Sequence, residues 1–218
     1  MKEETQKLRI FGFAALVVIV GAIILFNLSE KSHTDTSNKN GTLIRENSHS
    51  TATGTYNYKV TMVEFGDYQC PACRFVEPEI KKLIDEYKDK VKLVYRHYPL
   101  PQHKNAVIAA QAAEAAGEQA KFWEMHAKMY ETQDKWKDIE NPIDFYVGLA
   151  KEFALDTTKF KASVESGKFK DIIDQDRRDA DDFAISATPT LYINGEKYAG
   201  SMSYEAMKVK IDSILKKN

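Results

Sequence analysis

The sequence is poor in cysteine: its 218 residues contain only two, Cys70 and Cys73. So small a number excludes a scaffold that is held together by several disulfides. Three uses of the pair remain, namely a structural bridge, half of a metal site, or a redox centre. Because the chain has no second cysteine pair, a redox centre here has no internal store for the electrons that it collects.

An excess of charge of either sign is also missing. The chain has 31 Lys and Arg against 32 Asp and Glu, a formal net charge of −1. A balance so close to zero gives no long-range attraction for nucleic acid, and we expect no nucleic-acid partner. The length is sufficient for one main domain with a proper core.

Charge is absent altogether from residues 10–28, a run close to the roughly 20 apolar residues that span a bilayer as a helix. Lys2, Lys7 and Arg9 precede it, so the positive-inside rule places residues 1–9 in the cytoplasm and the rest of the chain outside. The following SEKSHTDTS has neither an A-x-A-like cleavage site nor a cysteine for a lipid anchor. We therefore expect an uncleaved, single-pass signal anchor in the cell membrane.

Residues 29–54 are rich in Ser, Thr, Asn, Asp and Lys and contain few apolar residues. Such a segment cannot bury enough apolar surface to fold by itself. We expect a flexible linker with a root-mean-square extension of roughly 30 Å. The folded domain is then expected over residues 55–218.

Hydrophobic periodicity and turn residues predict an α/β arrangement in the domain. A strand–helix–strand unit comes first, and its connection predicts two parallel strands. A block with only helical patterns follows, then a hairpin around Asn194-Gly195 and a closing helix. In chain order these elements are expected over residues 58–65, 70–90, 91–100, 105–184, 188–200 and 204–216.

The two cysteines form a C-P-A-C motif at the start of the first predicted helix. Two intervening residues allow the sulfurs to reach disulfide distance within one turn. Unpaired N–H groups and the helix dipole favour a thiolate on Cys70, so we expect a lowered pKa there. Cys70 is then the exchanging sulfur, and Cys73, one turn further in, resolves the mixed disulfide.

Two simpler uses of the cysteines stay open at this point, an inert bridge and a zinc site completed by His97 and His103. The five residues between the two histidines do not match the usual ligand spacing. His97 and His126 are instead expected to pack or to form hydrogen bonds at the ends of elements. No metal and no organic cofactor is expected.

An acidic run near the end of the helical block is interleaved with Arg177 and Arg178 and lacks the loop spacing of an EF-hand. We expect it to form the solvated face of a helix. Its members are Asp171, Asp174, Asp176, Asp179, Asp181 and Asp182.

Four segments occur in a characteristic order: VEFGDYQCPAC, YRHYPLPQH, GEQAKFWEMH and ATPTLYINGEKYAG. On these residues the chain resembles the DsbA-like thiol:disulfide oxidoreductases of the thioredoxin superfamily, especially the membrane-anchored Gram-positive type. The resemblance covers about residues 58–216. It implies a thioredoxin-like α/β fold with an inserted helical subdomain at about 105–184, preceded by the single transmembrane helix.

The resemblance also implies roles for particular residues. Pro189 matches the cis-proline that faces the redox pair in this family, with an ordinary strand-edge proline as the alternative. Thr188, before it, is implied to line the thiol site and to contact substrate. Glu64 matches the buried acid beneath the pair and is implied to relay the proton of Cys73, with an exposed strand-end glutamate as the alternative.

Pro71 and Ala72 lie between the cysteines, where the best-known oxidising members have a histidine as the second residue. Without a positive imidazole beside the Cys70 thiolate, a less oxidising potential is implied.

The expected function is extracytoplasmic disulfide formation in cysteine-containing exported proteins. A membrane-bound quinone-linked thiol oxidase is the expected partner for reoxidation. One alternative is a disulfide reductase or isomerase of the same fold. Another is a redox-inert peptide-binding or chaperone module in which the cysteines form a structural disulfide.

Overall fold

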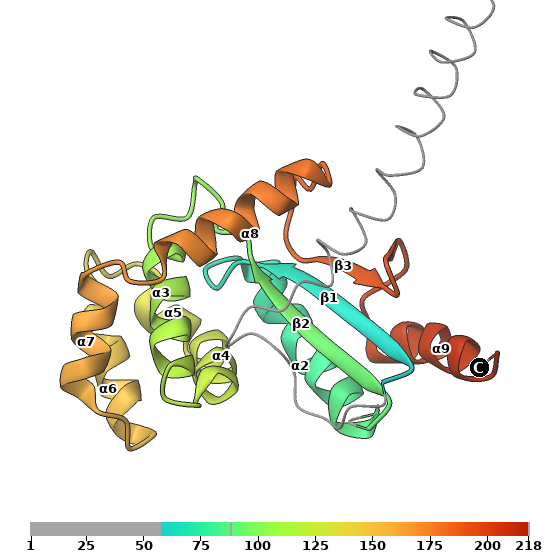
Figure 1. Cartoon of the computed structure of the whole chain (residues 1–218), viewed down its shortest axis with the longest axis horizontal. Helices are drawn as coiled ribbons and strands as arrows, with labels where there is room; N and C mark the ends of the chain where they lie inside the picture. Colours follow the sequence, from blue (N-terminus) through green and yellow to red (C-terminus); the bar gives the residue numbers. More distant parts are fainter. Residues whose placement is uncertain (1–57, 88, 218) are drawn as a thin grey trace, which may run out of the picture. The chain divides into compact units, whose positions relative to one another are not determined.

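A four-stranded mixed sheet organises residues 58–87 and 89–217, the part of the chain that the structure, a computed structural model, describes (Figure 1). The strand order is β2-β1-β3-β4. β1 (Val60–Gly66) pairs in parallel with β2 (Val91–His97). On its other side, β1 pairs antiparallel with β3 (Thr190–Ile193), which forms the predicted hairpin with β4 (Glu196–Lys197). The parallel pair and the hairpin are confirmed.

The predicted segments at residues 1–9, 10–28 and 29–54 lie outside the described residues. Within the described residues, no helix is both long enough and apolar enough to cross a membrane.

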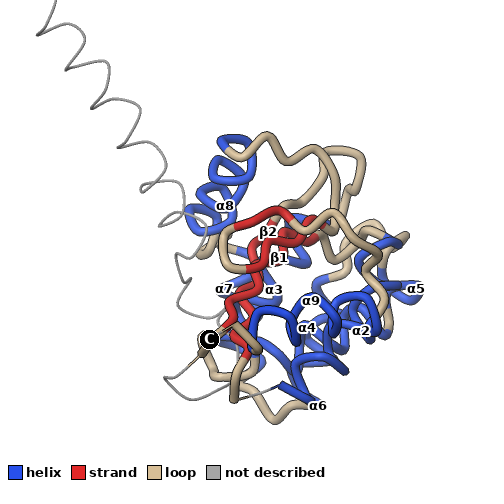
Figure 2. Tube along the Cα trace, turned by 90° about the vertical axis from the view of Figure 1, so that its right-hand side faces the viewer, coloured by secondary structure: helices blue, strands red, loops and turns tan. Residues whose placement is uncertain are grey.

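Helices cover both faces of the sheet. α2 (Pro71–Tyr87) and α9 (Tyr204–Leu215) pack on the face that carries Val60 and Met62, where their apolar side chains form a buried cluster with these residues. α8 (Lys170–Asp182) lies on the opposite face and contributes Ala180 to a second cluster (Figure 2). β1 is thus shielded both at its edges and on its faces, which leaves its side chains almost no contact with solvent.

The helical insertion predicted between the second strand and the hairpin is confirmed. It packs around a buried apolar cluster that includes Trp136, the largest fully buried side chain among the described residues. The first helix of the insertion, α3, is rich in alanine. Its neighbours can approach closely, since alanine side chains project little beyond the backbone. With α8, the insertion consists of α3 (Ala106–Gly117), α4 (Phe122–Glu131), α5 (Gln133–Trp136), α6 (Ile143–Glu152) and α7 (Thr157–Glu165).

Two aspartates of the acidic run are buried, and the prediction of a wholly solvated face is wrong for them. Asp176 is 0% exposed and Asp179 is 2% exposed. Arg96 of β2, itself fully buried, donates from Nε to Asp176 Oδ1 (2.6 Å) and from Nη2 to Asp179 Oδ2. The two aspartates are three residues apart, so both lie on the helix face toward the sheet. Arg96 needs these carboxylates because a buried charge without a partner is very costly.

We predict that Arg96→Met destabilises the protein by about 3–5 kcal/mol, since it leaves two buried carboxylates without their cation. Urea unfolding measures this loss. As a control, Asp144→Asn breaks an exposed pair with Lys161 and should leave the unfolding midpoint nearly unchanged. An Arg96→Met protein with an unaltered midpoint would contradict the importance of the buried pairs.

Candidate active site

Cys70 and Cys73 lie where β1 passes into α2. β1 ends at Gly66, a short turn follows, and α2 begins at Pro71, which suits a first helical turn because it has no N–H to leave unpaired. No disulfide joins the two cysteines in the structure. Cys73, one turn along α2, is 0% exposed and Cys70 is 6% exposed. The pair thus sits at a helix N-terminus, as the sequence predicts, and Pro71 and Ala72 between the cysteines are exposed.

The Thr188–Pro189 segment lies beside Cys70, and its peptide bond is cis. The Cys70 thiol donates a hydrogen bond to the backbone carbonyl of Thr188, with 3.4 Å between Sγ and O. Pairing of Phe65 with Thr190 explains the approach, because the same antiparallel register brings the preceding residues toward the turn after β1. The Thr188 hydroxyl is buried without a hydrogen-bond partner, so it is available as a donor to a Cys70 thiolate.

The two thiols have opposite shifts in pKa. The pKa of Cys70 is lowered to about 5, chiefly by a hydrogen bond from the Cys73 thiol. Burial opposes this shift, while the Thr188 side chain and the backbone N–H groups of Cys73 and Ala72 assist it. The pKa of Cys73 is raised by burial, by its hydrogen bond to Cys70, and by the negative charge of Glu64. Near neutral pH, Cys70 is therefore the thiolate and Cys73 keeps its proton.

Glu64 is buried in the interior strand β1, so the alternative of an exposed strand-end glutamate is wrong. It is 2% exposed, and its backbone pairs with Tyr95 on one side and Leu191 on the other. Burial raises its pKa to about 8, with further contributions from the negative charges of Glu77 and Cys70. Below that pH it is a neutral acid, and the effect of its charged form on the pKa of Cys73 indicates that the two groups lie close together.

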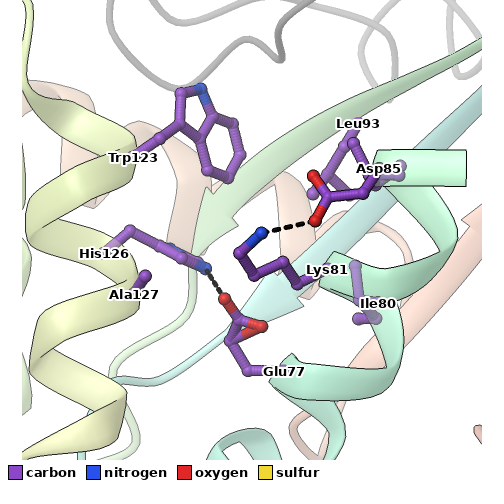
Figure 3. A pocket seen from close by; sticks show the side chains of 9 residues that line it. Glu77, Ile80, Lys81, Asp85, Leu93, Trp123, His126 and Ala127 are labelled. Carbon is purple, nitrogen blue, oxygen red and sulfur yellow. Dashed lines mark hydrogen bonds and ion pairs between the residues drawn. The ribbon is translucent and has the colours of Figure 1, made fainter. Parts of the chain in front are cut away.

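Glu77 is a second acid near the pair, and sequence reasoning missed it. Figure 3 shows Glu77 of α2 pointing toward His126 of α4 across a pocket between the two helices. Burial raises the pKa of Glu77 to about 7. Its Oε2 is buried without a hydrogen-bond partner, and its Oε1 lies 3.8 Å from Nε2 of His126. The available signal was its position four residues after Cys73, on the same helix face.

The histidines have structural partners, as predicted for His97 and His126, although His126 lies in the middle of α4 and not at the end of an element. His97 Nε2 is 2.8 Å from Glu114 Oε1, and His126 Nδ1 is 3.1 Å from the hydroxyl of Tyr68. Burial lowers the pKa of His126 to about 3, so its ring is neutral near pH 7. His103, the other histidine considered for zinc, contacts Asp67 through Nδ1 at 2.6 Å. Neither His97 nor His103 is directed to the cysteines.

A sheet of this order, with a Cys-x-x-Cys pair at the helix after its parallel strand and a cis-proline beside it, defines the class of thioredoxin-like proteins. The family model described as thioredoxin matches residues 46–213. The chain belongs to this family, in which it is a DsbA-like thiol:disulfide oxidoreductase. The resemblance found in the sequence is confirmed.

Three similar proteins illustrate the relationship. The "probable disulfide bond formation protein D" of Bacillus cereus is 30% identical, over 98% of this chain and 100% of that protein. The crystal structure of oxidised BdbD from Bacillus subtilis has a TM-score of 0.69 and 26% identity, covering 78% of this chain and 94% of that one. The Na(+)/H(+) antiporter NhaA 1 of Salinispora arenicola is 36% identical over 155 residues, 71% of this chain. The match spans only 23% of the antiporter's length.

We predict that the thiolate absorbance of the reduced protein titrates with a midpoint near pH 5, the lowered pKa of Cys70. Cys70→Ser should remove this transition, whereas a midpoint near 9 would contradict the assignment.

A linked effect on stability has a definite sign. A lowered pKa in the folded state stabilises the reduced protein fully above the ordinary thiol pKa, and this contribution is lost as the pH falls through about 5. Urea unfolding of the reduced protein between pH 7 and pH 4 should therefore show a steeper loss of stability than unfolding of Cys70→Ser. Equal losses in the two proteins would contradict the linkage.

Proposed function

We propose that the enzyme introduces disulfides into cysteine-containing exported proteins through the C-P-A-C pair. The opposite shifts in the pKa of Cys70 and Cys73 are the observation that supports this direction. A low pKa stabilises the reduced enzyme, and an enzyme with a stabilised reduced form has an oxidising disulfide. Such an enzyme readily transfers its disulfide to substrate thiols.

The reaction begins with the Cys70–Cys73 disulfide. A substrate thiolate attacks Sγ of Cys70, the bond between the cysteines breaks, and Cys73 leaves with the electron pair. A second substrate thiolate then attacks the substrate sulfur of the mixed disulfide and releases Cys70 as a thiolate. The substrate has lost two electrons to the enzyme, which is now in the dithiol form. A leaving thiol of low pKa makes the last step fast.

Glu64 is proposed to supply the proton that Cys73 needs when it leaves. Its pKa of about 8 keeps it protonated near neutral pH, and its electrostatic effect on Cys73 indicates proximity. Thr188 and Pro189 are proposed to contact the substrate chain, since the carbonyl of Thr188 already lies beside the Cys70 sulfur. Pro71 and Ala72 are exposed beside Cys70 and are proposed to tune its potential.

The proposed location is outside the cytoplasm, with residues 10–28 as the membrane anchor and 29–54 as the linker. Each turnover leaves two electrons on the enzyme, and the 218 residues contain no other cysteine to accept them. We propose that a membrane-bound quinone-linked thiol oxidase removes them. A tether on the enzyme increases the local concentration of such a partner.

A reductase or isomerase is the second candidate, and Ala72 is the observation that favours it. A histidine at this position would add a positive charge beside the thiolate, and alanine adds none. The third possibility, a redox-inert peptide-binding or chaperone module, does not agree with membership in an enzyme class.

We predict a redox potential closer to the roughly −120 mV of strong oxidants than to the roughly −270 mV of thioredoxin. Equilibration of the full-length protein in detergent with glutathione buffers measures this value. Cys73→Ser is the control and should accumulate as a mixed disulfide through Cys70. A potential at the thioredoxin end would favour the reductase, and a pair that never exchanges would refute the proposed function.

For Glu64→Gln we predict that attack on the oxidised enzyme slows by roughly 10²-fold at pH 7, because general acid catalysis typically contributes at least this much. Stopped-flow kinetics with a thiol peptide gives the rate per substrate thiolate. In the unaltered enzyme this rate should fall as Glu64 loses its proton, at a pH no higher than about 8 because the disulfide form lacks the Cys70 charge, and in Glu64→Gln it should stay flat.

Glu77→Gln provides a second comparison. It removes a negative charge that raises the pKa of Glu64, so the fall in rate should begin at lower pH. Identical pH profiles in the unaltered enzyme and in Glu64→Gln would exclude Glu64 as the proton donor.

A further inference from the structure

The turn that carries Cys70 is held from the helical insertion by one buried side chain. Gln133 is 1% exposed, and its Nε2 donates to the carbonyl oxygens of Tyr68 (2.8 Å) and Cys70 (3.1 Å). We infer that Gln133 is a positioning residue for the thiolate of Cys70, although it lies 63 residues away in sequence. This inference rests on the proposed role of Cys70 as the exchanging sulfur.

The peptide units of the turn are pinned on both sides. The unit between Tyr68 and Gln69 gives its carbonyl to Gln133, while its N–H donates to Asp67 Oδ1 at 2.7 Å. In the next unit, the N–H of Cys70 donates to the carbonyl of Asp67 at 3.0 Å. The carbonyl of Cys70 then accepts from Gln133 and, at 3.2 Å, from the N–H of Arg74. Gln133 therefore holds the Tyr68–Gln69 unit and the unit after Cys70, on either side of the Gln69–Cys70 unit.

Gln133 is itself fixed by the packing of α5. Trp136 of the same short helix is fully buried, and its indole N–H donates to the carbonyl of Met129 at 2.9 Å. Asn105 donates through Nδ2 to the carbonyls of Trp136, Lys137 and Ile139 at the end of α5. A buried amide held in this way is preorganised, since few rotamers remain open to it.

Gln69, in the redox turn, forms hydrogen bonds to the same two segments that Asn105 connects. Its Nε2 donates to the carbonyl of Lys137 at 2.9 Å, and its Oε1 accepts from the N–H of Asn105 at 2.7 Å. The redox turn, the loop before α3 and the end of α5 are thus joined through three amide side chains. A shift of α5 would move the backbone beside Cys70.

This geometry matters because the pKa of Cys70 depends on directed neutral donors. Besides the Cys73 thiol and the Thr188 side chain, these donors include the backbone N–H groups of Ala72 and Cys73. These N–H groups point at the Cys70 sulfur only while the first turn of α2 keeps its orientation. Gln133 contacts the carbonyl side of this backbone and not the sulfur itself. It therefore affects the Cys70 thiolate by fixing the position of the backbone that carries the N–H donors.

The test compares full-length reduced proteins by titration of thiolate absorbance. In Gln133→Leu two backbone carbonyls lose the same donor, and the pKa of Cys70 should rise by about one unit, which means about tenfold less thiolate well below pH 5. Alkylation by iodoacetamide at pH 4 should slow by the same factor. Gln133→Asn keeps an amide donor on a shorter side chain and should give an intermediate shift. It also serves as the test if the leucine variant does not fold.

Gln119→Leu is the matched control. Gln119 also forms two hydrogen bonds to backbone, donating to the carbonyl of Asp156 (3.2 Å) and accepting from its N–H (2.8 Å), within the insertion and away from the turn. This variant should lower the unfolding midpoint without changing the pKa of Cys70. A Gln133→Leu protein that behaves like it would overturn the inference. Failure of the unaltered protein to exchange thiols at all would instead refute the proposed function.

Discussion

The site depends on one constraint: the negative charge on the Cys70 sulfur is held by neutral groups. The hydrogen bonds that lower its pKa come from the Cys73 thiol, the Thr188 side chain and backbone N–H groups, none of which carries a positive charge. Dipoles act over a short range and only when they are aimed at the charge, whereas a cation tolerates displacement. With Ala72 in the place where an imidazole would stand, the frame around the sulfur has to be rigid. The buried Cys73, the strand pairing that places Thr188 beside Cys70 and the pinned turn provide that rigidity.

The same constraint explains why acids lie beneath the pair. Glu64 and Glu77 both have a raised pKa because they are buried, and the charge of Glu77 adds to the shift of Glu64. A raised pKa costs stability, because the stability of the folded state falls as the pH rises from the ordinary value toward the raised one. Such a cost is typical of a site that must bind and release a proton. Near neutral pH Glu64 also stays largely uncharged, so it does not repel the thiolate, whereas Glu77, with a pKa of about 7, is only partly charged.

The sequence predicts the features that arise from local patterns. The strand, the helix with C-P-A-C, the parallel partner and the Asn194-Gly195 hairpin each follow from residues that are close in the chain. Burial of Asp176 and Asp179 was not predictable in this way, because charge periodicity does not reveal that Arg96, about 80 residues earlier, is buried opposite them. Gln133 gave no signal either, since a glutamine in a helix is ordinary until its partners are known. Glu77 is an intermediate case, as its spacing from Cys73 was visible but its burial was not.

The helical insertion is therefore part of the redox site as well as a cover for the sheet. Its last helix is fixed to β2 through Arg96, and its short helix α5 is fixed to the turn through Gln133. Both attachments are made by buried polar groups, which are costly when misplaced and so favour a single arrangement. The insertion can then influence the pKa of Cys70 without contributing a charge. Two enzymes with the same C-P-A-C residues can for this reason differ in redox potential, if their insertions hold the turn differently. The dipeptide between the cysteines alone does not determine the direction of electron flow.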